Sequence, residues 1–299
     1  MKIIKILLAS IVIINGSIAQ EYPSVFPKKN IKDAIYYQDF LSFASDKAGI
    51  SRVDIFVQVP YKNVQFVKSN EGFTAKYSMT TSVFDSSKKK LIVEKTWNEK
   101  IDVIDFNIAT SKENYNLSKR SFELAPGTYF IRTMLQDKDS KQEAIGENIF
   151  SVKAFDATIS LSDILLISKS DNIQGKNEII PNISRNFPSS KSKVKFYVEV
   201  YLKDSLENRQ AFEYTVANSE NKIIHKEVED RNVKPGSNQI LYSLTEFPFD
   251  LGTYTLNVSL VDSTGKLIIA SSKSFYSHWK GLPSAITDID KAIAQTVYI

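Results

Sequence analysis

Histidine is the side chain best suited to proton transfer near neutral pH, and this chain of 299 residues has two, His225 and His278. A serine hydrolase needs a nucleophile, a histidine and an orienting acid brought together, but the sequence has no G-x-S-x-G elbow to supply the nucleophile. It has no cysteine either, which excludes thiolate catalysis, disulfides and cysteine-type metal sites. We therefore predict that the protein is not an enzyme, and we assign no catalytic residue and no cofactor.

The acidic segment "DKDSKQE" offers carboxylates at Asp137, Asp139 and Glu143. Calcium takes oxygen ligands from loops of this kind. The glycine of a calcium-binding loop is missing, however, and a related segment at 262–266 reads "DSTGK". This pattern favours a solvated hairpin tip, so no metal ligand is assigned, while calcium binding by the three carboxylates stays open as the alternative.

Two tyrosines, Tyr197 and Tyr201, lie on the polar face of one predicted strand. Aromatic rings at this spacing on an exposed sheet can stack on sugar rings or on a partner protein. They can equally pack against a neighbouring domain or against loops. The pattern makes both residues candidate partner contacts and leaves the packing alternative open.

Period-two alternation of apolar and polar residues predicts the strands that position these side chains. In segment 194–203 every second residue is apolar, from Val194 to Leu202, and segment 254–260 alternates in the same way. Turn signals such as Pro126-Gly127 and Pro235-Gly236 separate the strands. Many short strands with such punctuation and little helix predict an all-β protein made of antiparallel sandwiches.

Two parts of the chain resemble each other. Residues 127–141 read "GTYFIRTMLQDKDSK" and residues 252–266 read "GTYTLNVSLVDSTGK". Self-similarity at so long a period indicates two copies of one domain. We predict two tandem Ig-like antiparallel β-sandwich domains, at 33–156 and 157–277, with Tyr129 and Tyr254 at equivalent positions facing the two cores.

The first twenty residues, "MKIIKILLASIVIINGSIAQ", combine basic residues, an apolar run and small residues. This pattern is typical of a secretory signal peptide, here 1–19, cleaved between Ala19 and Gln20. The apolar run is too short to span a bilayer. Cleavage removes two of the 38 basic residues and leaves 36 against 34 acidic ones, or +2. We therefore expect an exported protein with no membrane span after cleavage and no nucleic-acid partner.

Residues 278–299 are predicted to form a linker and the start of a short C-terminal helix. Thr287 and Asp290 have the spacing of a capping box, and Ile289, Ile293 and Val297 recur at helical spacing. Because no terminating residue closes the helix, we expect a fragment of a longer protein, whose apolar stripe faces a missing C-terminal domain. The alternative is a tail helix docked on the second sandwich.

The same stretch carries a family resemblance. From Trp279 to Gln295 the chain has the pattern W-x-x-x-P-S-x-x-x-D-x-D-x-A-I-x-Q. It resembles the linker of GWxTD domain-containing proteins, and the upstream "FLSFASDKAGISRVDIFVQVPYKNVQFVKSNEGFTAKY" is similar to the N-terminal region of that family. The resemblance implies an exported bacterial protein with a sandwich-like N-terminal region. The Gly-Trp-x-Thr-Asp motif itself is absent from the chain, so nothing that depends on the domain named for it is carried over.

Together these patterns predict an exported, non-catalytic interaction module of the bacterial cell envelope, in the periplasm, at the outer membrane or outside the cell. Sandwiches without catalytic motifs commonly serve as binding modules, so this expectation rests on analogy. The partner is expected to be a protein or a glycan, and the candidate contact residues are Tyr197, Tyr201, Trp279, Ile289, Ile293 and Val297. The alternative is an accessory N-terminal region of an enzyme whose active domain is missing from this chain.

Overall fold

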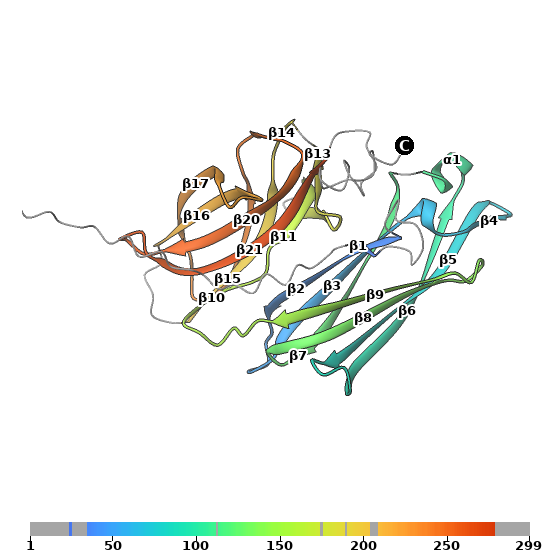
Figure 1. Ribbon diagram of the computed structural model, residues 1–299, viewed down its shortest axis with the longest axis horizontal. Helices are drawn as coiled ribbons and strands as arrows, with labels where there is room; N and C mark the ends of the chain where they lie inside the picture. Colours follow the sequence, from blue (N-terminus) through green and yellow to red (C-terminus); the bar gives the residue numbers. More distant parts are fainter. Residues whose placement is uncertain are drawn as a thin grey trace, which may run out of the picture.

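The computed structural model describes residues 24–25, 35–111, 113–173, 176–188, 190–203 and 209–278. Within these ranges the chain is nearly all β-structure and forms two sandwiches that lie side by side (Figure 1). The predicted all-β class is confirmed. Several other predictions fall outside the described residues, namely the signal peptide 1–19 with its Ala19/Gln20 cleavage site, and the terminal helix with Trp279, Ile289, Ile293 and Val297.

The first sandwich consists of two sheets. One has the order β1-β2-β3-β7 and contains β1 (Ser24–Val25), β2 (Tyr36–Ala44), β3 (Ser51–Pro60) and β7 (Tyr115–Leu124). The other has the order β4-β5-β8-β9, with β6 also paired to β5, and contains β4 (Phe66–Ser69), β5 (Gly72–Asp85), β6 (Leu91–Val103), β8 (Gly127–Asp137) and β9 (Glu143–Val152). The inner faces of both sheets contribute to one core, which includes Phe40, Ile55, Tyr77, Met79 and Ile131.

The second sandwich begins after a connection at 153–158. Its first sheet contains β10 (Ile159–Leu161), β11 (Leu165–Ile173), β12 (Lys176–Pro181), β15 (Lys195–Leu202) and β18 (Gly236–Ser243). Its second sheet contains β13 (Asn186–Pro188), β16 (Arg209–Asn218), β17 (Ile223–Asn232), β20 (Gly252–Val261) and β21 (Leu267–His278). The short strands β14 (Ser190–Ser192) and β19 (Phe247–Phe249) pair with each other. One core fills the space between the two sheets.

The alternation in the sequence matches the burial in this core. Val194, Phe196, Val198 and Val200 are fully buried and Leu202 nearly so. On β20 the residues Leu256, Val258 and Leu260 are likewise fully buried, while the polar residues between them are not. The period-two pattern therefore identified the inward faces of these strands correctly.

Seven strands of each sandwich follow the same order. In the first, β2-β3-β7 belong to one sheet and β6-β5-β8-β9 to the other; in the second, the corresponding sets are β11-β15-β18 and β17-β16-β20-β21. At the start of β8 the hydroxyl of Tyr129 donates to Ala125 O, and at the start of β20 the hydroxyl of Tyr254 donates to Asp250 O. The pairing differs from the antiparallel prediction at one place, because β13 runs parallel to the end of β21. There the chain approaches the end of β21 from the turn at 182–185 rather than from a hairpin.

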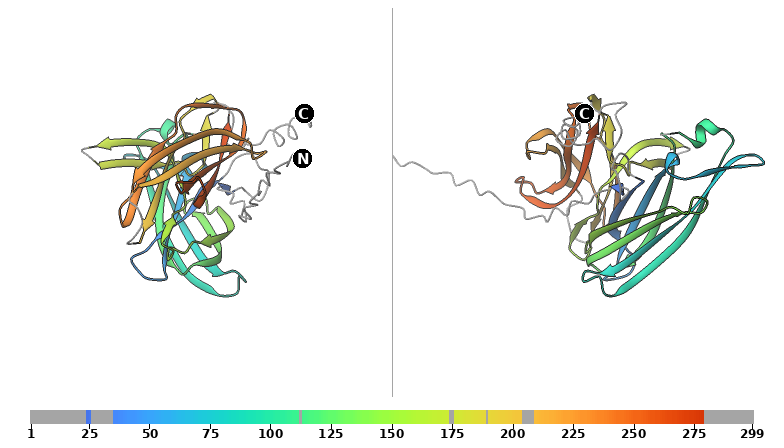
Figure 2. Two further views of the ribbon diagram at one scale, coloured as in Figure 1. Left: turned by 90° about the vertical axis from the view of Figure 1, so that its left-hand side faces the viewer. Right: turned by 45° about the vertical axis from the view of Figure 1, so that its right-hand side comes forward.

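The two sandwiches lie against each other (Figure 2), and strand β2 is buried on both of its faces. Tyr36 and Phe40 point into the first core. The alternate residues Tyr37, Leu41 and Phe43 form a separate apolar cluster with Phe56 of β3 and with Leu165 and Ile183 of the second sandwich. Burying an apolar side chain of this size contributes about 1.5–3 kcal/mol, so the cluster is a substantial contact between the two halves.

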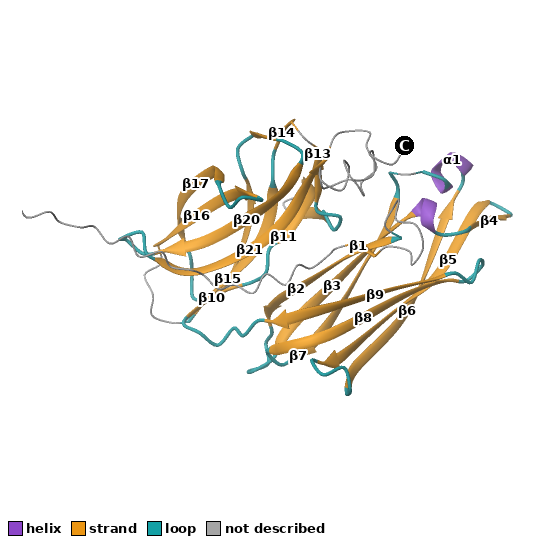
Figure 3. Cartoon of the chain, in the orientation of Figure 1, coloured by secondary structure: helices purple, strands orange, loops and turns teal. Residues whose placement is uncertain are grey.

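Helical structure in the described ranges is confined to η1 (Tyr61–Asn63) and α1 (Phe106–Ala109), both in the first sandwich (Figure 3). Asp105 caps α1 by accepting the N–H of Asn107. Among the residues that the structure describes, no helix has the length and apolar character needed to cross a bilayer.

Candidate functional site

His225 lies on β17 in a polar cluster at the edge of the second sandwich. Its Nε2 is 2.7 Å from Glu227 Oε1 and 3.5 Å from Thr245 Oγ1, and its ring stacks on Phe247 with 4.2 Å between centroids. In a catalytic triad the acid and the nucleophile contact opposite ring nitrogens. Here Glu227 and Thr245 contact the same ring nitrogen, Nε2, so the cluster lacks the arrangement of a proton relay. The backbone of His278 pairs with Pro188 at the end of β21, far along the chain from this cluster.

Glu227 is the acceptor that the other polar residues of this cluster share. Desolvation acts to raise the pKa of Glu227, but hydrogen bonds from Thr245, His225 and Tyr242 outweigh it and lower that pKa to about 2. Conversely, desolvation and the hydrogen bond to Glu227 raise the pKa of Tyr242 to about 12. The cluster joins β17 to β18 and to the connection between β18 and β19, and so links the two sheets of the second sandwich.

The predicted hairpin tip at 137–143 is held by the buried Asp137. Its Oδ1 accepts the N–H groups of Asp139 and Ser140, each at 2.9 Å, and its Oδ2 accepts the N–H of Gln65 at 2.7 Å. Glu143 accepts a hydrogen bond from Gln136. In the described part of the chain, no three His, Asp or Glu residues are grouped so that they could hold a metal ion. The Asp137 carboxylate therefore organises the turn.

Two other hairpins use the same arrangement. Asp85 Oδ1 accepts the N–H groups of Lys89 and Lys90, and Asp262 Oδ1 accepts those of Thr264 and Lys266. The N–H of Lys90 is the main cause that lowers the pKa of Asp85, whereas at Asp262 the Thr264 hydroxyl lowers the pKa most and the N–H of Lys266 adds to it. The tripeptide Lys88–Lys90 thus belongs to a turn.

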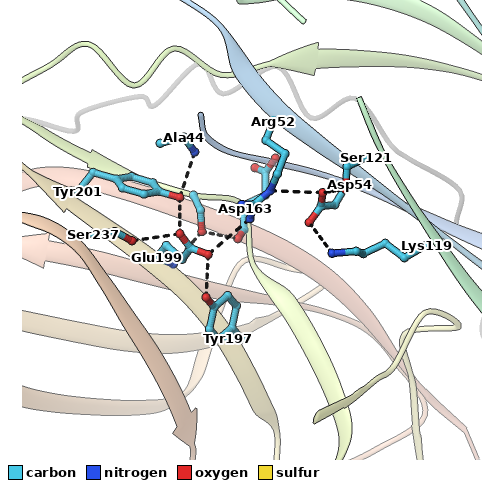
Figure 4. Close-up of polar contacts among 11 residues, drawn as sticks. Ala44, Arg52, Asp54, Lys119, Ser121, Asp163, Tyr197, Glu199, Tyr201 and Ser237 are labelled. Atoms are coloured by element: carbon cyan, nitrogen blue, oxygen red, sulfur yellow. Dashed lines mark hydrogen bonds and ion pairs between the residues drawn. The ribbon is translucent and has the colours of Figure 1, made fainter. Parts of the chain in front are cut away.

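The candidate contacts Tyr197 and Tyr201 lie between the two sandwiches. Both are on the face of β15 that is opposite to the second core, with Glu199 between them (Figure 4). Tyr197 packs beside Phe43 of β2, with 6.4 Å between ring centroids. The Tyr201 hydroxyl accepts the N–H of Ala44 at 3.0 Å. These rings thus contact the neighbouring sandwich, which corresponds to the packing alternative.

Glu199 is buried, and each of its carboxylate oxygens has two neighbours. Oε1 accepts the hydroxyl of Tyr197 at 2.7 Å and lies 3.6 Å from Arg52 Nη2. Oε2 accepts the hydroxyls of Tyr201 at 2.7 Å and Ser237 at 3.2 Å. Desolvation, and then hydrogen bonding to this carboxylate, raise the pKa of both tyrosines well above the ordinary value. The tyrosines therefore act as fixed donors, and Glu199 is occupied as an acceptor.

Arg52 of β3 links this network to the first sandwich. Its Nε is 3.4 Å from Asp54 Oδ1, and its guanidinium lies 4.8 Å from the centre of the Phe43 ring. Asp54 also accepts the hydroxyl of Ser121 at 2.7 Å and lies 3.4 Å from Lys119 Nζ. The Arg52 side chain is 40% exposed. The side chain is therefore in contact with solvent, and it lies between Asp54 of the first sandwich and Glu199 of the second.

A cleft of about 370 Å³ opens beside this network. Its first wall is the turn after β2 together with Arg52, and its second is the outer face of β15 and β18. The connection between the sandwiches contributes Phe155 and Ala157. The residues that line the cleft are Ala44, Ser45, Asp46, Arg52, Phe155, Ala157, Glu199, Tyr201, Leu202, Lys203, Gly236, Ser237 and Gln239.

A buried ion cluster elsewhere in the interface joins β2 of the first sandwich to the second sandwich, and little in the sequence indicates it. Asp39 of β2 is fully buried and its Oδ1 pairs with Arg185 and, at 2.6 Å, with Lys273. Arg185 and Lys273 are themselves 3% and 6% exposed. The only local signal is an aspartate within the apolar run "YYQDFLSFA", because a charge inside such a strand needs a partner. Its partners lie far away in the sequence.

Comparison with known proteins gives no family. No protein-family model and no curated protein matches the chain. A red sea bream transglutaminase structure matches with a TM-score of 0.26 and 11% identity, over 83% of this chain and 32% of that one. A Bacteroides uniformis beta-glucuronidase matches with a TM-score of 0.29 and 9% identity, over 76% of this chain and 26% of that one.

A glycosyl hydrolase family 2 member from Bacteroides cellulosilyticus gives a TM-score of 0.28 and 8% identity, over 76% of this chain and 28% of that one. The chain thus spans about a third or less of these structures. Likeness at this level gives no argument for a shared activity, substrate or partner.

Proposed function

We propose that the protein is an exported, non-catalytic interaction module of the bacterial cell envelope, built from two tandem Ig-like copies of one sandwich. The observation that carries the proposal is the interface between the sandwiches. An apolar cluster, the buried Asp39 ion cluster and the Glu199 network all cross it. Domains joined by small polar contacts move relative to each other, whereas a large apolar contact fixes them. A fixed pair of sandwiches with a polar cleft between them is suited to recognition.

The chemistry of the described residues supports binding over turnover. Glu199, the most buried carboxylate at the cleft, is saturated by hydrogen bonds and is therefore a poor general base. The His225 cluster lacks the geometry of a relay. The cleft instead offers hydrogen-bonding side chains on fixed strands, which is what a binding site requires.

The tandem arrangement draws support from the shared strand order and from the two tyrosines. Tyr129 and Tyr254 each donate to a carbonyl four residues upstream, and each is the third residue of its strand, β8 or β20. This is the geometry of the tyrosine corner of Ig-like sandwiches. Gly127 and Gly252, two residues before them, have φ of 151° and 149°, a backbone region that is essentially restricted to glycine. Export and the GWxTD relationship enter the proposal from the sequence alone.

The proposal is tested with the mature chain, purified from an envelope fraction and analysed by intact-mass spectrometry and by binding measurements. We expect an N-terminus at Gln20. Incubation with solubilised envelope components should give saturable, reversible binding in which the mass of the recovered partner is unchanged. Time-dependent chemical conversion of any component by the purified chain would refute a non-catalytic role, and an intact Met1 would refute export by cleavage.

A further inference from the structure

The cleft lies on the face of a sheet and not along a strand edge. Tyr201 is directly opposite Ser237 in the register of β15 and β18, and Glu199 is opposite Gln239. All four line the cleft. A peptide that binds by strand addition needs an open edge with unpaired backbone groups. A ligand in this cleft meets side chains instead, so its chemistry has to match those side chains.

The charges that line the cleft are balanced. Arg52 and Lys203 are cationic, and Asp46 and Glu199 are anionic. An anionic ligand would face the two carboxylates, and a cationic ligand would face the guanidinium and the ammonium group. A neutral ligand with hydroxyl groups meets neither obstacle, because each hydroxyl both donates and accepts hydrogen bonds. Ser237 and Gln239 extend the same mixture of donors and acceptors.

An aromatic ring completes the cleft. Phe155 packs against Tyr201 edge to face, with 5.1 Å between centroids and 75° between planes. Phe155 is only half-buried, and Ala44 and Ala157 lie on the same lining. An apolar patch beside convergent polar groups suits a molecule that has a C–H face and a rim of hydroxyls. A sugar ring has such a C–H face and such a rim of hydroxyl groups.

We propose that the interdomain cleft binds a neutral, polyhydroxylated ligand, namely one or two units of an uncharged saccharide. The inference rests on the proposed interaction function and specifies its ligand. Phe155 supports the ring face, Arg52, Lys203 and Gln239 donate to hydroxyl oxygens, and Asp46 accepts from hydroxyl hydrogens. Glu199 does not touch the sugar but holds Tyr201 and Arg52 in position.

The test is a titration of the ¹⁵N-labelled mature chain, followed by amide chemical shifts. The probes are glucose, galactose, mannose and N-acetylglucosamine with their β-1,4-linked disaccharides, and glucuronate and glucosamine as charged counterparts. We expect at least one neutral probe to shift the amides of Ala44, Asp46, Tyr201 and Gln239. The charged counterparts should bind about tenfold more weakly, a difference of about 1.4 kcal/mol.

Two variants localise the binding. Phe155→Ala should weaken the best neutral probe about tenfold, the size of effect expected for one ring contact. Phe106→Ala, which removes a 59% exposed ring on α1, should leave the affinity unchanged. A dispersed amide spectrum of each variant shows that it is folded.

Three results would overturn the cleft assignment. The first is the absence of amide shifts with every neutral probe at about 50 mM, a concentration at which millimolar affinity is detectable. The second is tighter binding of glucuronate than of glucose. The third is a set of shifts confined to residues outside the cleft. If the cleft fails in this way while the chain still binds an envelope component reversibly, only the saccharide assignment is lost. If reversible binding fails as well, the interaction function is lost with it.

Discussion

Asp163 and Ser42 exchange two hydrogen bonds across the interface between the sandwiches. The Ser42 N–H donates to Asp163 Oδ2 at 2.7 Å, and the Asp163 N–H donates to Ser42 O at 3.1 Å. Two residues further along the same edge of β2, the Ala44 N–H donates to Tyr201. An open strand edge is a template for unwanted pairing. The second sandwich thus covers the edge of β2 with its own hydrogen-bonding groups.

Tyr201→Phe should destabilise the interface more than Tyr197→Phe. The Tyr201 hydroxyl bonds to both Ala44 N–H and Glu199, whereas the Tyr197 hydroxyl bonds to Glu199. Leaving a fully buried donor unsatisfied costs about 1–3 kcal/mol, and the partly buried Ala44 N–H should cost less than this range. We expect faster amide hydrogen exchange at Ala44 in Tyr201→Phe and little change there in Tyr197→Phe. Equal exchange rates at Ala44 in the two variants would argue against this role for Tyr201.

Asp39→Ala should lower the free energy of unfolding by about 3–5 kcal/mol, because it leaves two buried cations without their carboxylate. Urea unfolding of the variant and of wild type measures the difference. Glu71→Gln, a change at an exposed acidic residue, is the control and should alter stability by less than about 0.5 kcal/mol.

The combination Asp39→Leu, Arg185→Leu and Lys273→Met offers a second control. Replacing the charged members of a buried ion cluster together by apolar residues is often neutral, so the triple variant should be more stable than Asp39→Ala. A triple variant that is as unstable as Asp39→Ala would contradict the assignment of the loss to the two cations that pair with Asp39.

Glu227 gives the protein a predictable acid dependence. Its pKa is about 2 in the folded state against an ordinary 4.5. A lowered folded pKa means that the stabilisation is fully present above the unfolded pKa and is lost as pH falls towards the folded one. We expect wild type to exceed Glu227→Gln in melting temperature above pH 4.5, with the gap narrowing between pH 4.5 and 2. A gap that stays constant across that window would show that the ionisation of Glu227 is not its source.

Tyr129→Phe and Tyr254→Phe should have similar effects if the sandwiches are copies of one domain. Each change removes one hydrogen bond to a backbone carbonyl, worth about 0.5–1.5 kcal/mol. Chemical unfolding of the two variants measures both losses. A large loss in one variant with none in the other would speak against equivalent corners.

The sequence was informative where burial follows a local period. Val198 and Val200 of β15 and their neighbours alternate with polar residues, and the inward face could be predicted from that pattern. The hairpin tips at Asp85 and Asp262 could also be predicted, because an aspartate that caps its own turn acts within a few residues.

The interface could not be predicted in this way, because its partners are brought together only by the packing of two complete sandwiches. Asp39 and Lys273 are 234 residues apart, and no local pattern joins them. Tyr201 alternates as an exposed residue does, and it is partly covered by the neighbouring sandwich and by Phe155 of the connection. Strand β2 lacks alternation since both of its faces are covered, and a short apolar run of this kind is ambiguous when read alone.

The claim on which the rest depends is that the two sandwiches form one fixed body with the cleft between them. Residual dipolar couplings of backbone amides in a weakly aligned sample report the orientation of each sandwich directly. We predict that a single alignment tensor fits the couplings of residues 36–152 and 159–278 together, with the orientation seen in Figure 1. Two tensors of different magnitude or direction would show that the sandwiches move independently and would contradict the account.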